Sequence, residues 1–223
     1  MTQDEQALQQ QKIAFLEGRR ALYAKVAGGW PPTVVDQAQL AEIRSLLLKD
    51  IGHARSFVAE SPDNQHGREI YADLLRMAHN LDVPDAARQA DAVLRNILAH
   101  DPDSYAAHLS LASLYITLQP ELAAEAARHF QRALELRPEI PDPAIYQGLG
   151  FASLHQGQVA GAIENFQKYL SLVPTDKRIA EFAERLSKGE VPTRIQAPPA
   201  ENTAPVESAV PAEKERKSWW KRW

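Results

Sequence analysis

Residues 143–174 read PAIYQGLGFASLHQGQVAGAIENFQKYLSLVP, and this stretch decides the fold. Its apolar residues recur at helical spacing on both sides of a turn at Gly157. This spacing predicts two amphipathic helices, because residues three and four positions apart share one helix face. Pro174 closes the segment, since proline cannot continue a helix interior. The stretch therefore predicts a helix-turn-helix unit.

Similar units precede this one along the chain. Pro102, Pro138 and Pro174 lie 36 residues apart in both intervals. A unit of this kind cannot bury its apolar face alone, so consecutive units must stack on one another. We therefore expect an all-α solenoid of three units, at residues 71–104, 105–140 and 143–176.

These units resemble the tetratricopeptide repeat (TPR) family, a 34-residue helix-turn-helix with characteristic aromatic, small and proline positions. In the third unit the matching residues are Tyr146, Leu149, Gly150, Ala162, Phe166 and Pro174. In the second they are His108, Leu111, Ala112, Tyr115, Ala126, Phe130, Ala133 and Pro138. In the first, where the opening matches by hydrophobicity only, they are Leu74, Met77, Ala78, Leu81, Ala90, Leu94, Ile97 and Pro102.

The match departs from the family pattern in three places. Ser153 stands where the family has an aromatic residue, and Tyr169 stands where it has alanine. The turn around Gln119-Pro120-Glu121 is about two residues longer than the 34-residue family repeat allows. The resemblance covers residues 71–176 and implies stacked helices with a concave groove that binds other proteins.

Two longer helices are expected before the array, at residues 3–28 and 34–60. Glycines at 28–29 and prolines at 31–32 separate them, because glycine ends helices and proline bars their continuation. We expect residues 1–62 to pair as an antiparallel helical hairpin. The hairpin either caps the array or offers its heptad-like apolar stripe to a second copy, as a homodimer interface.

The segments after the array differ in composition. Residues 177–189 have the amphipathic pattern of a capping helix. Residues 190–223 are rich in proline and alanine without periodicity, which predicts a disordered linker. The chain ends in AEKERKSWWKRW, which holds three of its four tryptophans. These last twelve residues carry five basic and two acidic side chains, so a net charge of −4 for the whole chain leaves −7 for the remainder.

Composition argues against several classes of protein. The chain has no cysteine, so it has neither a disulfide framework nor a thiolate metal site. A net charge of −4 argues against nucleic-acid binding, which needs a basic face. The sequence shows no signal-peptide pattern and no run of roughly 18 apolar residues. We expect a cytoplasmic protein, with peripheral attachment to a membrane as the alternative.

No pattern points to catalysis or to metal binding. The seven histidines form no pair at i, i+4 spacing and no H-E-x-x-H motif. The glycines at 148 and 150 belong to the repeat rather than to a phosphate-binding loop. We therefore expect a non-enzymatic protein without a cofactor.

The groove that the TPR resemblance implies is formed by the first helix of each unit. Its positions are Leu75, Arg76, His79, Leu109, Ser113, Ile116, Gln147, Phe151 and His155. Most of these side chains are apolar or neutral, so we do not expect the Lys, Asn and Arg clamp with which some TPR proteins hold a C-terminal carboxylate. An apolar groove suits an extended or helical segment of a protein partner.

The end of the chain is a second candidate binding surface. Aromatic side chains anchor many protein interfaces, and tryptophan with cations also suits a membrane interface. Three targets stay open: an acidic protein partner, a membrane and the chain's own acidic body. The leading hypothesis is an adaptor whose groove and tail hold different proteins, and the alternative is a membrane-peripheral assembly factor. The tail residues are Lys217, Trp219, Trp220, Lys221, Arg222 and Trp223.

Overall fold

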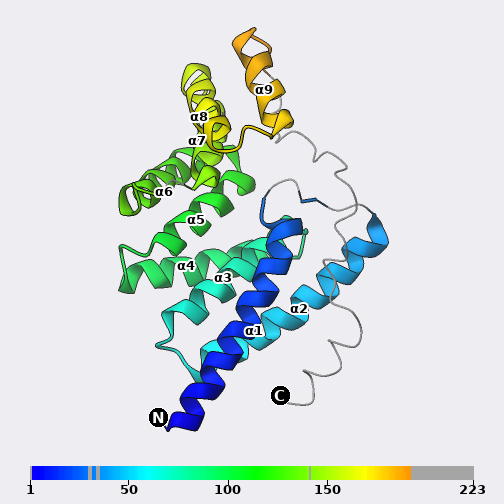
Figure 1. Cartoon of the computed structure of the whole chain (residues 1–223), viewed down its shortest axis with the longest axis vertical. Helices are drawn as coiled ribbons and strands as arrows, with labels where there is room; N and C mark the ends of the chain where they lie inside the picture. The colour runs from blue at the N-terminus through cyan, green and yellow to red at the C-terminus, as the bar shows by residue number, and fades with distance from the viewer. Residues whose placement is uncertain (1, 30–31, 34–35, 141, 192–223) are drawn as a thin grey trace.

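The computed structural model describes residues 2–29, 32–33, 36–140 and 142–191. These residues form nine α-helices, one 3₁₀ helix and no strand (Figure 1), which confirms the all-α prediction. The helices are α1 (Gln3–Ala27), α2 (Gln37–Glu60), α3 (Gln65–Asn80), α4 (Ala86–His100), α5 (Tyr105–Leu118), η1 (Pro120–Leu122), α6 (Ala123–Leu136), α7 (Pro143–His155), α8 (Val159–Leu172) and α9 (Lys177–Ser187).

The two helices of each unit begin differently. Asn64, Ser104 and Asp142 precede α3, α5 and α7, and each side chain accepts a hydrogen bond from a backbone N–H two or three residues later. These bonds satisfy donors that the first turn of a helix leaves without a partner. The second helices α4, α6 and α8 have no side-chain cap and instead follow directly on the turn within the unit.

The turns that join the two helices of each unit are formed by different residues. Gly157, before α8, has a φ of 72°, and Asp85, two repeat lengths earlier and before α4, has a φ of 60°. Glycine adopts this left-handed conformation freely, and aspartate is among the few other residues that tolerate it. In the second unit η1 takes up the longer turn between α5 and α6.

Neighbouring helices pack closely where glycine faces an aromatic ring. A Cβ atom at Gly148 would collide with Cζ of Phe130, and one at Gly150 would lie 2.5 Å from Cε1 of Phe166. Both phenylalanines are fully buried. The absence of a side chain at these two positions of α7, which lie on opposite faces of the helix, therefore lets α7 approach α6 on one side and α8 on the other.

The N-terminal helices run antiparallel, and both pack against α3. Lys12 of α1 pairs with Glu60 of α2, and Arg19 pairs with Asp50. A later residue of α1 thus pairs with an earlier residue of α2, as it does in an antiparallel pair. Asp50 is 2% exposed and accepts hydrogen bonds from Nε of Arg19 at 2.5 Å and from the hydroxyl of Tyr23 at 2.6 Å. This buried network fixes the register of the pair.

The last helix closes the apolar core. Phe182 of α9 packs against Phe151 and Phe166, with ring centroids 6.0 and 5.7 Å apart. These rings belong to a cluster that spans α7, α8 and α9, and a larger cluster spans α1 to α7. Ile116 of α5 contacts both clusters, so the core is continuous along the array.

Candidate protein-binding groove

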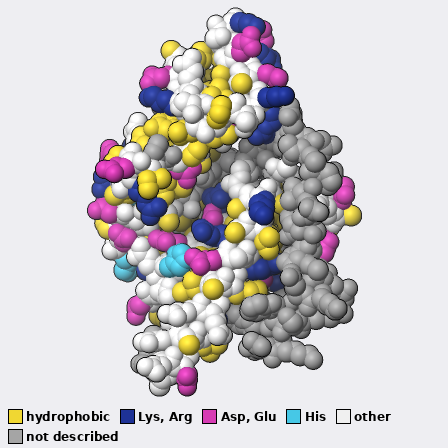
Figure 2. All heavy atoms as spheres, in the orientation of Figure 1, with side chains coloured by type: hydrophobic (Ala, Val, Ile, Leu, Met, Phe, Trp, Pro, Cys, Tyr) yellow, Lys and Arg dark blue, Asp and Glu magenta, His cyan; other side chains and the backbone are white. Residues whose placement is uncertain are grey.

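The first helices of the units form the inner layer of the array. Among the described residues, the backbone of α5 lies close to both α3 and α7, whereas the backbones of the second helices α4, α6 and α8 stay further apart, and α4 meets α6 through the ion pair of Arg95 with Glu125. Because the spacing is closer on the side of α3, α5 and α7, the array curves toward that side. The concave groove lies there, and Figure 2 shows the surface hollowed between the repeat helices and the α1–α2 pair.

The end of α1 covers the part of the groove that α3 forms. Nη1 of Arg76 donates to the carbonyl oxygen of Gly28 at 2.9 Å. Nδ2 of Asn80 donates to the carbonyl oxygens of Ala27 at 2.8 Å and Gly29 at 3.2 Å. These donors satisfy carbonyls that the end of a helix leaves without a partner. The chain therefore occupies its own groove at the first unit.

This cover decides which groove positions of the first unit a partner can reach. Leu75 is 2% exposed, and Arg76, which donates to the carbonyl oxygen of Gly28, is 7% exposed. His79 is half-buried. Of the three positions expected in this unit, only His79 keeps appreciable contact with solvent.

The second and third units leave more of the groove accessible. Leu109 and Ile116 of α5 are half-buried, as is Gln147 of α7. The hydroxyl of Ser113 donates to the carbonyl oxygen of Leu109 within the same helix, at 2.8 Å. Phe151 is 9% exposed and belongs to the core beneath α9. The accessible surface over α5 and α7 is therefore apolar with neutral polar groups.

The two histidines at groove positions add no charge near neutral pH. Burial lowers the pKa of His79, against the opposite influence of the Asp82 carboxylate. Burial also lowers the pKa of His155, against the influence of Glu121. Both side chains are therefore neutral at pH 7, and these two positions carry no fixed positive charge.

A polar cluster that the sequence did not indicate joins the first and second units. Nδ1 of His108 and Nδ1 of His129 lie 2.8 Å apart, and Nε2 of His108 lies 2.9 Å from the carbonyl oxygen of Pro102. The Tyr115 hydroxyl donates to Asp91 at 2.5 Å. The repeat pattern places His108 and Tyr115 at packing positions. Their side-chain partners, His129 and Asp91, lie 21 and 24 residues away along the chain, which is too far for helical spacing to predict the contacts.

The remaining sequence expectations fall partly outside the described chain. The tail residues 217–223 lie outside the described residues.

Within the described ranges, no cluster of three or more His, Cys, Asp or Glu side chains could hold a metal ion. None of the helices in those ranges has the length and hydropathy needed to cross a bilayer.

Comparison with solved structures identifies the type of fold. The chain is similar to a thermophilic TPR protein of Thermus thermophilus, with a TM-score of 0.52 over 69% of this chain and 82% of that one. The fold is TPR-like. Sequence identity over the match is 19%, so the likeness concerns the fold alone, and the number of repeats stays a prediction. No protein-family model and no curated protein matches the chain.

Proposed function

We propose that this protein is a protein-interaction scaffold whose concave groove, over α5 and α7, binds an apolar segment of a protein partner. One observation carries the proposal. The N-terminal segment covers the groove at α3, through Arg76 and Asn80, but the groove positions of α5 and α7 are not covered in this way. A partner segment would continue along the groove from the point where the chain's own segment ends.

The character of the groove supports an apolar partner. Leu109 and Ile116 form a half-buried ridge, and the hydroxyl of Ser113 is already bonded within its own helix. A partner with few charges loses little hydration there, whereas a charged segment would lose hydration without gaining an ion pair. An amphipathic helix or an extended strand with apolar side chains fits this surface best.

A matched pair of glutamines tests the proposal. A photo-crosslinking amino acid at Gln147, on the groove side of α7, should capture a partner in the native host. The same amino acid at Gln167, exposed on α8, should not. The Gln147→Arg variant should weaken binding of the captured partner by at least about tenfold, because it places an unpaired charge in an apolar interface. Equal capture from both positions, or equal affinity of Gln147→Arg and Gln167→Arg, would contradict groove binding.

The end of the chain favours a second site on the same scaffold. Three tryptophans and three cations within residues 217–223 have the composition of an interface anchor. In the adaptor hypothesis this peptide holds a second protein, and in the alternative it holds an anionic membrane. Co-sedimentation of the full chain with anionic vesicles at low salt distinguishes the two, since the membrane alternative requires binding under these conditions.

A further inference from the structure

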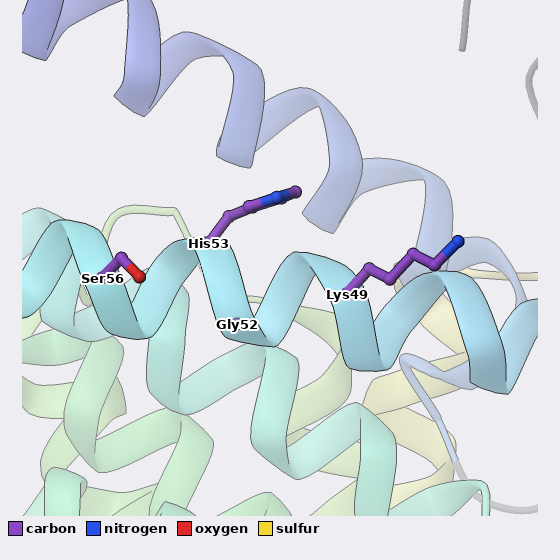
Figure 3. A pocket seen from close by; sticks show the side chains of 4 residues that line it. All are labelled: Lys49, Gly52, His53 and Ser56. Carbon is purple, nitrogen blue, oxygen red and sulfur yellow. The ribbon is translucent and has the colours of Figure 1, made fainter. Parts of the chain in front are cut away.

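A pocket lies on α2, beside the contact of His53 with Phe15 of α1, on the side that the repeats do not cover. Lys49, Gly52, His53 and Ser56 of α2 line it, and its volume is about 710 Å³. These positions are three and four residues apart, so they share one face of α2. Figure 3 shows His53 reaching from this face toward α1. A volume of this size is in the range of pockets that take ligands or side chains, roughly 300–1,000 Å³.

The floor of the pocket is rigid. Nδ1 of His53 lies 3.5 Å from Oδ1 of Asp50, and its ring meets the edge of Phe15 of α1 at a centroid distance of 6.2 Å. Asp50 is itself held by Arg19 and Tyr23. The His53 ring is therefore fixed in place by both helices before any ligand arrives, which reduces the entropy that binding must offset.

The walls of the pocket suit an aromatic side chain. A Cβ atom at Gly52 would meet nothing within 4 Å, so the backbone of α2 is open to close approach there. Leu48, one residue before Lys49, is 49% exposed. The methylene stem of Lys49 and the His53 ring supply further apolar surface. An indole would bury its rings against these groups and keep its N–H near the rim.

The chain carries a segment of the matching chemistry. Trp219, Trp220 and Trp223 lie among cations in the last seven residues, outside the described part of the chain. On α2, Glu42 and Glu60 are exposed at the two ends of the face that bears the pocket, and Glu60 pairs with Lys12 of α1. The last twelve residues carry +3 and the rest of the chain carries −7, so the overall charges are complementary.

The tether makes an intramolecular contact favourable. Residues 192–218 are the 27 residues between the last described residue, Val191, and Trp219. A stretch of 27 residues reaches at most about 90 Å when fully extended. α1, with 25 residues, is about 37 Å long, so this maximum reach exceeds the length of the N-terminal helices. A tethered segment acts at an effective concentration on the order of millimolar, which a separate partner rarely reaches.

We infer that the C-terminal Trp/basic peptide, residues 217–223, binds in cis to the pocket on α2 beside His53. In this state the tryptophans are withheld from other targets, and a partner or a membrane must compete with the pocket to engage them. The inference goes beyond the groove function and does not depend on it, because the pocket lies on α2 and the proposed groove lies over α5 and α7.

Cysteine pairs test the contact directly, because the native chain has no cysteine to interfere. The double variant Ser56→Cys with Ser218→Cys joins the pocket to the residue before Trp219. The control pairs Ser218→Cys with Ser171→Cys, an exposed serine at the end of α8 that is nearer in sequence to the tail. Tether length alone would favour the control. We expect an intramolecular disulfide to form on the order of tenfold faster in the pocket pair.

A pocket-filling substitution separates docking from random encounter. Gly52→Leu should slow formation of the 56–218 disulfide to the rate of the control, because its side chain occupies the pocket without meeting other atoms. Ala160→Leu, at an exposed site on α8, should leave the rate unchanged. Gly52→Leu should melt no lower than the wild type, because leucine favours helix more than glycine does.

Three outcomes would overturn the inference. Equal rates for the pocket pair and the control would show that the tail has no preference for the pocket. A fast rate that persists in Gly52→Leu would place the tail elsewhere on α2. Disulfide-linked dimers at low protein concentration, in place of the intramolecular product, would show that the pocket receives the tail of a second copy. None of these outcomes bears on crosslinking from Gln147, so the two proposals fail separately.

Discussion

Gly150 shows how a single residue sets the spacing of the helices in the third unit. A Cβ atom there would lie 2.5 Å from the ring of Phe166, a buried side chain with no room to move. Gly150→Ala should therefore destabilise the protein by about 1–3 kcal/mol, through overpacking of the α7–α8 contact. Gly161→Ala, in the same unit, is the control, because its Cβ would meet Ser153 at an ordinary 3.6 Å.

The changes in stability caused by the two glycine substitutions should differ in sign as well as in size. Gly161→Ala should leave stability unchanged or raise it by up to about 1 kcal/mol, because alanine favours helix. Urea denaturation of both variants gives the comparison. Equal stabilities would mean that the α7–α8 contact can open at no cost.

His129 makes stability depend on pH. Burial lowers its pKa below the ordinary value of 6.5, and the nearby His108 lowers it further, with smaller influences from Glu125, Arg95 and Arg128. The folded state therefore binds fewer protons than the unfolded state as pH falls through 6.5. The contribution of His129 is fully present above that pH and is lost below it. His79 and His155, whose pKa values are also lowered, act in the same direction.

Thermal denaturation at pH 7.5 and 5.5 measures this effect. We expect a lower melting temperature at pH 5.5, and a smaller difference between the two pH values in His129→Gln than in the wild type. A variant with the same pH dependence as the wild type would mean that His129 does not contribute to it.

At the scale of elements, the two ion pairs that join α1 and α2 contribute unequally to stability. Asp50 is buried beneath Arg19 and Tyr23, whereas Glu60, which pairs with Lys12, has a side chain that is 58% exposed. Removal of one partner of a buried pair leaves an uncompensated charge, whereas an exposed pair gains little. Asp50→Ala should therefore cost about 3 kcal/mol, and Glu60→Ala at most about 1 kcal/mol.

Denaturant titration of the two variants checks this difference, since both residues join the same two helices. Proteolysis adds a readout specific to the element. Asp50→Ala should expose cleavage sites in α1 at lower denaturant concentration than Glu60→Ala does. Equal effects of the two substitutions would contradict the assignment of Asp50 as the residue that fixes the α1–α2 register.

At the scale of the whole molecule, we expect removal of α9 to destabilise mainly the helices next to it. A chain that stops after Val173 lacks α9 and uncovers Phe151 and Phe166, which pack against Phe182. The cost should be roughly 3 kcal/mol or more, as for loss of a buried aromatic side chain. Because repeat units depend mainly on their neighbours, the loss should be concentrated in α7 and α8.

Hydrogen exchange measures where the protection is lost. Amides of α7 and α8 should exchange faster in the shortened chain, and those of α3 and α4 should keep most of their protection. A chain that stops after Val191 retains α9 and is the control. Equal loss of protection over all helices would show that the molecule unfolds as one cooperative unit.

The sequence by itself determined the all-α fold, and its helix-turn-helix pattern predicts the repeats. These features depend on short-range rules: helical spacing of apolar residues, a left-handed residue at Gly157 and a proline such as Pro174 after the second helix. The structure confirms the all-α prediction because every one of these signals acts within a few residues of the backbone that it shapes.

Only the tertiary structure decided which surfaces a partner can reach. Arg76 and Asn80 bond to carbonyls 48 to 53 residues away, and these contacts close the groove over α3 while it stays accessible over α5 and α7. His53 of α2 likewise meets Phe15 of α1 only because the two helices pair at a particular register. Such contacts depend on long-range packing and on the closing of long loops, for which the sequence carries no local periodicity.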